Sequence, residues 1–234
     1  MRLILVRHGQ ASAGSADYDR LSDRGRQQSQ RLGAWLADTG QRFDHVVTGG
    51  MRRHRQTYEG IAEAYARGGL SLPEPDVDHG FDEFDHQAVF GGFVARHPTH
   101  PAVQASQQGG LSALAAMIHA ALSAWAEDGI EGVPETWVDF GARVRLAGDK
   151  LAQRSAGPVL VISSGGVISR LAQAALGLPD RSAVDLNLSL RNSGLCEFHL
   201  RPSPPGTSPW NRLALGSWNA LPHLHDAQEL WTYY

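Results

Sequence analysis

Short apolar runs that alternate with segments of helical periodicity constrain the fold of this chain most strongly. The runs lie at residues 2–6, 43–48 and 158–163, and their length and composition are typical of buried strands. Helical spacing of apolar side chains covers the segment from the N-cap Ser22 to Gly40 and residues 52–66, 111–125, 135–153 and 166–176. Strands that alternate with helices build a mostly parallel sheet covered on both faces. We therefore predict an α/β fold, a three-layer sandwich around a mostly parallel central sheet.

The remaining segments are expected to complete one domain over residues 1–234. Pro73 and Pro75 predict a loop or an edge strand, because proline removes a donor from the sheet ladder. Residues 81–110 are rich in Gly, His, Pro and Gln without a clean period, so we predict an irregular insertion there. This cap over the site is expected to extend to about residue 135. Later strands are predicted at 188–200 and 212–218, with a proline-rich loop at 201–209 between them.

Composition and charge restrict the classes of function. Of 234 residues, 42% are hydrophobic and 19% charged, as in ordinary folded proteins rather than disordered ones. The net charge of −3 argues against a general binder of nucleic acid or of acidic membranes. The basic run Arg52-Arg53-His54-Arg55 at the start of a predicted helix therefore favours a small-anion site.

Cysteine usage and the absence of long apolar runs suggest a cytoplasmic protein. The single Cys196 excludes an intrachain disulfide, and its place in a predicted strand favours a small buried side chain. The apolar run before Arg7 is too short for the core of a signal peptide. No run approaches the ~18 apolar residues that a membrane span needs.

The tripeptide Arg7-His8-Gly9 directly follows the first predicted strand. The carboxyl ends of strands are the places where open α/β sheets bind their ligands. The guanidinium of Arg7 offers a planar fork of donors for phosphate, and His8 offers a nitrogen that can act as nucleophile, acid or base. Together they indicate phosphoryl chemistry on an imidazole, although for the tripeptide alone a chance polar turn is the favoured explanation.

Further segments in order along the chain resemble the histidine phosphatase superfamily, the phosphoglycerate-mutase-like proteins. The second signature of that family is a strand that ends in small residues, followed by a helix with Arg-x-x-Gln-Thr, and Arg53 with Gln56-Thr57 fits it. The other matching segments are Leu21–Gln28, the acidic segment Phe81–Phe84, the strand and turn Val159–Ile168, Asn192, Trp218-Asn219 and His223-Leu224. The resemblance covers nearly the whole chain.

The resemblance implies a role for each site residue. His8 would be the nucleophile, with Arg7 and Arg53 binding the phosphate and keeping the imidazole unprotonated. Glu83 would protonate the leaving group and then activate water, with Asp82 and Asp85 as less favoured candidates. Backbone amides at Ser164 and Gly165 would also bind phosphate at the start of a helix. The implied ligand is a small phosphorylated molecule, and no metal or cofactor is expected.

The sequence departs from the family pattern at two positions. The last turn of the family reads His-Gly, whereas this chain has Ser164-Gly165. An asparagine that many members place after the first motif is replaced by Gly14. Serine cannot reach as far as imidazole or carry its charge, so we expect a slow enzyme that Ser164→His would accelerate if the pocket has room. A non-catalytic phosphate-binding or interaction protein is the alternative, and a mutase is less expected because the Trp-Asn that follows Arg-His-Gly in mutases is missing.

Other reactive side chains are given structural interpretations. The pairs His97/His100 and His223/His225 have the spacing of metal ligands, but no matching acidic or cysteine set accompanies them, which favours surface or loop roles. Ser164 lacks the glycine two residues earlier that a nucleophile elbow requires. The large apolar side chains Met117, Trp125 and Trp137 lie on helical apolar faces and are assigned to the core.

Overall fold

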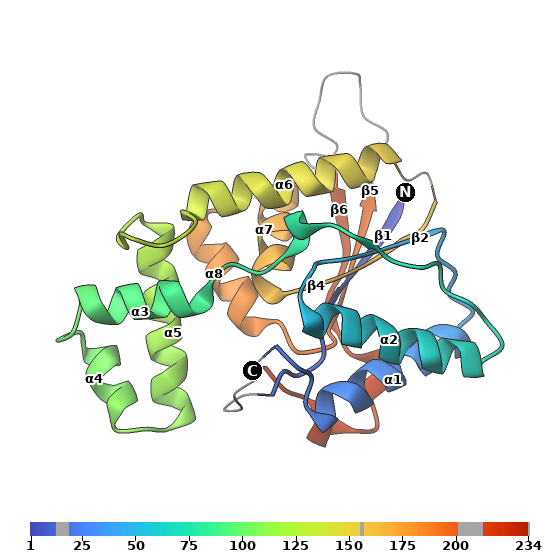
Figure 1. Cartoon of the computed structure of the whole chain (residues 1–234), viewed down its shortest axis with the longest axis horizontal. Coiled ribbons are helices and arrows are strands. Elements are labelled where there is room, and N and C mark those ends of the chain that lie inside the picture. Colours follow the sequence, from blue (N-terminus) through green and yellow to red (C-terminus); the bar gives the residue numbers. More distant parts are fainter. Residues whose placement is uncertain (13–18, 155–156, 201–212, 234) are drawn as a thin grey trace.

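A computed structural model describes residues 1–12, 19–154, 157–200 and 213–233 of the chain (Figure 1). Gly14 and the predicted loop at 201–209 lie outside these ranges. The strands are β1 (Arg2–Arg7), β2 (His45–Thr48), β3 (Asp76–Val77), β4 (Val159–Ser163), β5 (Leu195–Leu200) and β6 (Leu213–Ala220). The α-helices are α1 (Asp23–Asp38), α2 (Arg52–Arg67), α3 (His86–Arg96), α4 (Pro101–Gln107), α5 (Leu111–Ala126), α6 (Trp137–Arg154), α7 (Gly165–Leu176) and α8 (Asp180–Ser189), with short 3₁₀ turns η1 (His79–Phe81), η3 (Pro222–Leu224) and η4 (Gln228–Leu230).

The strands form one six-stranded sheet in the order β3-β2-β4-β1-β5-β6. The first four in this order are parallel, and β5 and β6 add to the edge as antiparallel neighbours. The predicted α/β class with a mostly parallel sheet is therefore confirmed. In the register of β1 and β4, Arg7 stands opposite Ser163, so the ends of two strands from distant parts of the sequence meet.

Side chains of the central strands alternate between the two faces of the sheet, and both faces are buried. Ile4 and Val6 of β1 pack with apolar residues of α1 and α2. Leu3 and Leu5 point the other way and pack with residues of α6, α7 and α8. Helices therefore cover both faces, which explains why β1 is continuously apolar (Figure 1).

Several predicted elements are confirmed with shifts of one to three residues at their ends. Helix α1 begins after Ser22, whose hydroxyl accepts a hydrogen bond from the Gly25 amide at 3.1 Å, as an N-cap should. Helix α2 ends at Arg67 with Gly68 as its C-cap, as expected from the glycine pair that follows it. Strand β3 lies at the edge of the sheet immediately after Pro75. The predicted burial of Cys196, Met117, Trp125 and Trp137 is also found.

The prediction of an irregular segment at 81–110 is wrong, because it contains two helices. The side chain of Asp85 caps α3, accepting from the Ala88 amide at 3.0 Å, and that of His100 caps α4, accepting from Ala102 at 3.2 Å. Each helix buries only one or two apolar side chains, among them Val89 and Phe93. Such short helices leave too little periodicity for a sequence pattern to reveal.

The predicted strand at 188–200 begins only at Leu195, and helix α8 precedes it. Leu188 and Leu190 fit the apolar alternation of a strand, yet α8 packs against α5 and α7, and this tertiary contact decides the conformation. A turn then redirects the chain at Ser193, which adopts a left-handed backbone with φ 58°.

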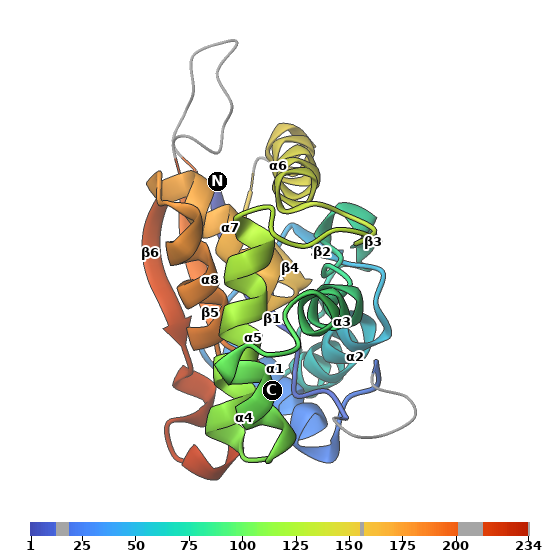
Figure 2. The same ribbon diagram turned by 90° about the vertical axis from the view of Figure 1, so that its left-hand side faces the viewer.

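Helices α3, α4 and α5 stand together at one side of the molecule (Figures 1 and 2). Both α3 and α4 pack on α5, and α5 in turn contacts α8. Figure 2 looks at the molecule from this side, with α4 and α5 toward the viewer. Within the described ranges, no helix is both long enough and apolar enough to cross a membrane.

Candidate active site

His8 lies immediately after β1, at the carboxyl end of the parallel strands. Its amide donates to the Ser163 carbonyl at 2.9 Å, which extends the pairing of β1 with β4 by one residue. Gly9 then passes very close to helix α1: a Cβ at this position would lie 2.4 Å from the Gly25 carbonyl oxygen. The glycine of the first motif is therefore required by this close approach.

A buried polar layer holds the backbone of the first motif from behind. The Ser193 amide donates to the carbonyls of Arg7 at 3.0 Å and His8 at 3.2 Å, and the Asn192 side-chain amide also donates to the His8 carbonyl. The Ser193 hydroxyl lies 2.8 Å from Nε2 of His223, whose pKa burial lowers to about 3. His223 is buried in the short turn η3, so of the two predicted roles, surface or loop, the surface role is wrong.

The hydrogen bonds of the His8 ring define its tautomer. Nδ1 lies 2.7 Å from the Gly9 carbonyl oxygen, which can only accept, so Nδ1 carries the proton. Nε2 is left as the acceptor and receives a hydrogen bond from Nε of Arg53 at 3.1 Å. Burial, followed by the charges of Arg53 and Arg7, holds the pKa of His8 well below 6.5. The site thus contains a neutral imidazole whose lone pair faces a cation.

Arg53 is fixed in the first turn of α2 by contacts on both sides of its guanidinium. Besides the His8 contact, Nη1 donates to Asp19 at 2.7 Å, and the side chain is almost fully buried. The neighbouring motif residues join α2 to the His8 loop, since the Thr57 hydroxyl accepts from the Gly9 amide at 3.0 Å and Gln56 accepts from the Leu21 amide at 2.8 Å. Thr57 therefore links α2 to the His8 loop, and Gln56 links it to the segment before α1.

Glu83 follows η1 and reaches the start of helix α7. Its Oε2 accepts from the Gly166 amide at 3.0 Å, and a Cβ on Gly166 would lie 2.2 Å from Oε1. Burial raises the pKa of Glu83, with the Gly166 hydrogen bond and the two arginines opposing the shift. Of the alternative acids, Asp85 caps α3, and Asp82 accepts from the Gly50 amide and binds His79.

These side chains meet in one cleft of about 290 Å³. One part of its lining, here called the polar floor, consists of Arg7, His8, Arg53 and Glu83. A second part, here called the apolar wall, consists of Phe84, Phe90, Leu114, Ile118, Leu122 and Leu188. His86 and Asn187 complete the lining. Arg7 also donates to the Leu190 carbonyl, which ties it to the end of α8.

The model of the histidine phosphatase superfamily (branch 1) matches residues 3–212. The chain belongs to this superfamily. Solved structures agree in fold, and among them is a phosphoserine phosphatase mutant from Entamoeba histolytica bound to phosphoserine, with TM-score 0.62 and 19% identity over 95% of this chain and 98% of that one. No curated protein sequence gives a significant match.

Two further structures have the same fold but different activities. A mycobacterial glucosyl-3-phosphoglycerate phosphatase is 24% identical, with TM-score 0.60 over 94% of this chain and 98% of that one. A phosphoglycerate mutase from Bacillus anthracis is 16% identical, with TM-score 0.62 over 96% and 95%. At these identities the likeness shows the fold alone.

Ser164 and Gly165 are buried at the start of α7, and neither is among the described residues that line the cleft. The Ser164 hydroxyl lies 2.7 Å from Nε2 of His54, which is also fully buried. The ring centroids of His54 and His8 are 5.7 Å apart. Sequence reasoning counted His54 only as part of a basic run and missed this contact. Its helical spacing with the buried Tyr58 and Ile61 is the signal that could have revealed it.

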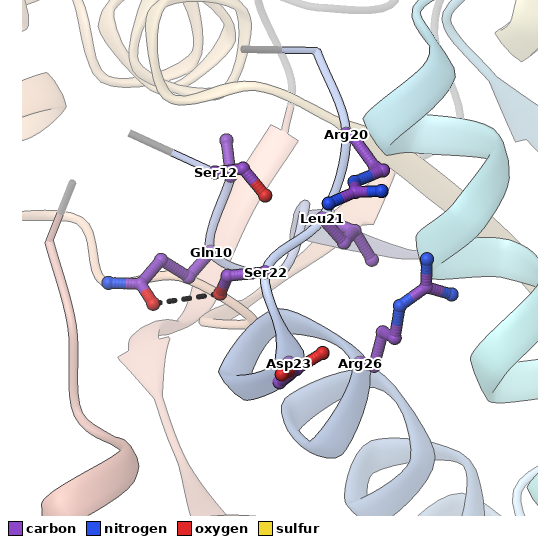
Figure 3. A pocket seen from close by; sticks show the side chains of 8 residues that line it. Gln10, Ser12, Arg20, Leu21, Ser22, Asp23 and Arg26 are labelled. Atoms are coloured by element: carbon purple, nitrogen blue, oxygen red, sulfur yellow. Dashed lines mark hydrogen bonds between the residues drawn. The ribbon is translucent and has the colours of Figure 1, made fainter. Parts of the chain in front are cut away.

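A second hollow, about 460 Å³ in volume, is lined by residues between the first motif and the first turn of α1, and none of its described lining residues belongs to the cleft (Figure 3). Figure 3 shows the Ser22 hydroxyl donating to Gln10 at 2.9 Å, with Arg20 and Arg26 from the following loop and helix. The hollow is therefore polar.

The remaining histidine pair with metal-like spacing has a packing role. The rings of His97 and His100 both contact Phe93, with centroids 5.1 and 5.3 Å away. In the described part of the chain, no cluster of three or more His, Cys, Asp or Glu side chains is arranged for a metal ion.

Proposed function

We propose that this protein is a phosphomonoester phosphatase that acts through a phosphohistidine intermediate on His8. The observation that carries the proposal is the contact of 3.1 Å between His8 Nε2 and Arg53 Nε in the polar floor. An unprotonated imidazole nitrogen beside a cation is suited to attack a phosphate dianion whose charge that cation stabilises. Membership of the superfamily supports the same chemistry.

In the first step, His8 Nε2 forms a bond to phosphorus while the bond between phosphorus and the ester oxygen breaks. Arg53 releases Nε2 as the substrate enters, and with Arg7 it binds the non-bridging oxygens. Glu83 gives its proton to the departing ester oxygen, which leaves as an alcohol. The raised pKa of Glu83 favours the protonated form that this step requires.

In the second step, water attacks the phosphorus and gives a proton to the Glu83 carboxylate. The bond between phosphorus and His8 Nε2 breaks, and orthophosphate leaves. This step restores the neutral imidazole and the protonated acid with which the cycle began. The Nδ1–H bond to the Gly9 carbonyl keeps Nε2 as the reactive nitrogen throughout.

We further propose that Ser164 stands where other family members have their second histidine, and that this lowers the rate. Removal of one donor to the transition-state oxyanion costs about 10²–10³-fold. The Gly166 amide already binds Glu83, so the start of α7 offers fewer donors to a phosphate than the sequence suggested. The account predicts a slow phosphatase.

A non-catalytic phosphate-binding protein remains the second candidate, favoured by the burial of Ser164 outside the cleft lining. Turnover of p-nitrophenyl phosphate by the wild type and by His8→Ala separates the two. We expect slow turnover that His8→Ala abolishes, with exposed His225→Ala as an unchanged control. Binding of inorganic phosphate without turnover would favour the second candidate.

A further inference from the structure

The apolar wall carries an inference about the substrate of the proposed phosphatase. Leu114, Ile118 and Leu122 are spaced four residues apart, so they form one stripe along α5 that faces the cleft. Phe90 from α3 and Leu188 from α8 extend the wall on either side. The stripe begins at the accessible Leu114, which is 41% exposed, and ends at the buried Leu122.

Among the described residues that line the cleft, those that carry a full charge, Arg7, Arg53 and Glu83, belong to the polar floor. Beyond Arg7 and Arg53, the lining offers one further basic side chain among the described residues, His86. Burial, followed by the charge of Arg53, lowers the pKa of His86, so it is neutral near pH 7. A substrate carboxylate would therefore be placed against hydrocarbon without a cation to pair with it, which is costly.

We propose that the alcohol portion of the substrate is apolar and uncharged. The inference rests on the proposed function, because it assumes that the phosphate binds at the polar floor. It separates this chain from one structural neighbour, the phosphoserine phosphatase from Entamoeba histolytica, which was crystallised with phosphoserine and with 3-phosphoglyceric acid, since both of those ligands carry a carboxylate.

The test compares kcat/KM for 2-(1-naphthyl)ethyl phosphate, an alkyl ester with an alcohol leaving group like those of the other two, with kcat/KM for phosphoserine and 3-phosphoglycerate. We expect a preference for the naphthyl ester of at least about tenfold, since small apolar differences in a pocket give 10–200-fold. Leu114→Ala should reduce the preference, and Leu114→Lys should shift it toward 3-phosphoglycerate. Leu111→Ala is the matched control, because Leu111 is on the same helix, 83% exposed and outside the lining.

A binding measurement keeps this inference separate from the proposed function. Calorimetry with 1-naphthylmethylphosphonate and with the phosphonate analogue of phosphoserine needs no turnover. Tighter binding of the naphthyl compound without turnover of any ester would support the inference and reject the phosphatase. A preference for either carboxylate-bearing ester, in turnover or in binding, would overturn the inference.

A second inference rests on the contact between His54 and Ser164. Both side chains are fully buried, the Nε2–Oγ distance is 2.7 Å, and the His54 ring lies beside His8. Burial, followed by the charge of Arg53, lowers the pKa of His54, so it is a neutral partner for the hydroxyl. The imidazole of His54 in α2 thus contacts Ser164, at the turn before α7 where the family pattern has a histidine.

We propose that His54 is a positioning residue that acts through Ser164, so that the pair performs a part of the task of the missing histidine and the enzyme stays slow but active. The inference also rests on the proposed function. It corrects the expectation that Ser164→His alone would accelerate the enzyme. The His54 ring already occupies the space beside the Ser164 hydroxyl, and a second imidazole would collide with it.

A double-mutant cycle tests the pair. We expect His54→Ala and Ser164→Ala each to lower kcat about ten- to a hundredfold, and the double variant to lose no more than the larger single effect. His54→Gln should recover most of the activity because its amide can bond to the hydroxyl, whereas His54→Phe should not. The exposed Arg55 of the same helix supplies the control, Arg55→Ala.

The reciprocal exchange gives the sharpest result. His54→Ala with Ser164→His should be faster than either single variant, since the alanine makes room for the new imidazole. Additive losses in the cycle, or full activity in His54→Phe, would show that the pair is only structural. If His8→Ala retains wild-type turnover, the proposed function fails instead. Thermal unfolding of each variant identifies losses that come from misfolding.

Discussion

The polar floor and the apolar wall share one cleft but are built in opposite ways. The floor stands at the ends of central strands, and hydrogen bonds from distant segments fix it, such as those of Ser193 to the first motif and of Thr57 to Gly9. The wall consists of Phe84 and of faces of α3, α5 and α8, which are held mainly by the packing of these helices on one another. The comparison suggests that the floor determines the chemistry and the wall determines which ester is accepted.

The largest effect on the chemistry of the polar floor is expected from a substitution of Glu83. With an alkyl phosphate, Glu83→Gln should lower kcat/KM, which reports the transfer to His8 and not the later hydrolysis, about 10²–10⁴-fold, because the alkoxide needs a proton to leave. With p-nitrophenyl phosphate, whose leaving group is already stable as an anion, the loss should be much smaller. Equal losses with the two substrates would mean that Glu83 is not the acid.

The pH profile of the same variant adds a check. Wild-type kcat/KM for the alkyl ester should fall as pH drops through the lowered pKa of His8, because the protonated imidazole cannot attack. It should also fall as pH rises through the raised pKa of Glu83, because the acid is then ionised. Glu83→Gln should remove the alkaline limb and keep the acid limb. The wild type and Glu83→Gln act on the same substrate. The titration of the substrate phosphate therefore affects both profiles equally and does not change the difference between them.

Substitutions of Arg53 test whether the polar floor depends on the hydrogen-bond geometry of the guanidinium or only on its positive charge. Arg53→Ala should lower kcat about 10²–10³-fold. Arg53→Lys keeps the charge but loses the planar fork that contacts His8 and Asp19 together, so it should recover only part of this loss. Steady-state kinetics measure both variants, and full activity in Arg53→Lys would reduce the role of Arg53 to its charge.

Substitutions in the apolar wall are predicted to change kcat/KM for large apolar esters without changing the rate of the chemical step. Phe90→Ala should lower kcat/KM for 1-naphthyl phosphate about tenfold while changing that for p-nitrophenyl phosphate, the smaller ester, less. Val94→Ala on the same helix, outside the lining, provides the comparison. A large fall in kcat for both esters would place Phe90 in the chemistry and remove the division between floor and wall.

The smallest expected effect is that of chelators. Arg7 and Arg53 supply the positive charge that a phosphatase metal would otherwise provide, so turnover should be unchanged by EDTA. Loss of activity in EDTA that a divalent ion restores would show that the floor has been misinterpreted.

The floor was largely predictable from the sequence because its parts are local motifs at strand ends. Arg7-His8-Gly9 and Arg53 with Gln56-Thr57 each follow a short apolar run, and parallel strands place such ends together. The polar layer behind His8 was not predictable in this detail, since Ser193 and His223 reach it through a turn with a left-handed residue.

The wall and the His54–Ser164 contact were not predictable for different reasons. Helices α3 and α4 are too short for a period, and α8 replaces a segment whose alternation resembled a strand. The His54–Ser164 contact joins positions 110 residues apart in the chain, so no local pattern contains it. Packing between distant elements, rather than local preference, determines these features.

The covalent intermediate tests the central claim most directly. Wild-type enzyme would be mixed with a ³²P-labelled phosphomonoester, quenched within milliseconds, digested and mapped. The account predicts a phosphoryl group that is labile to acid and stable to base, on the peptide that contains His8. Turnover without label on His8, or an acid-stable label on Ser164, would contradict it.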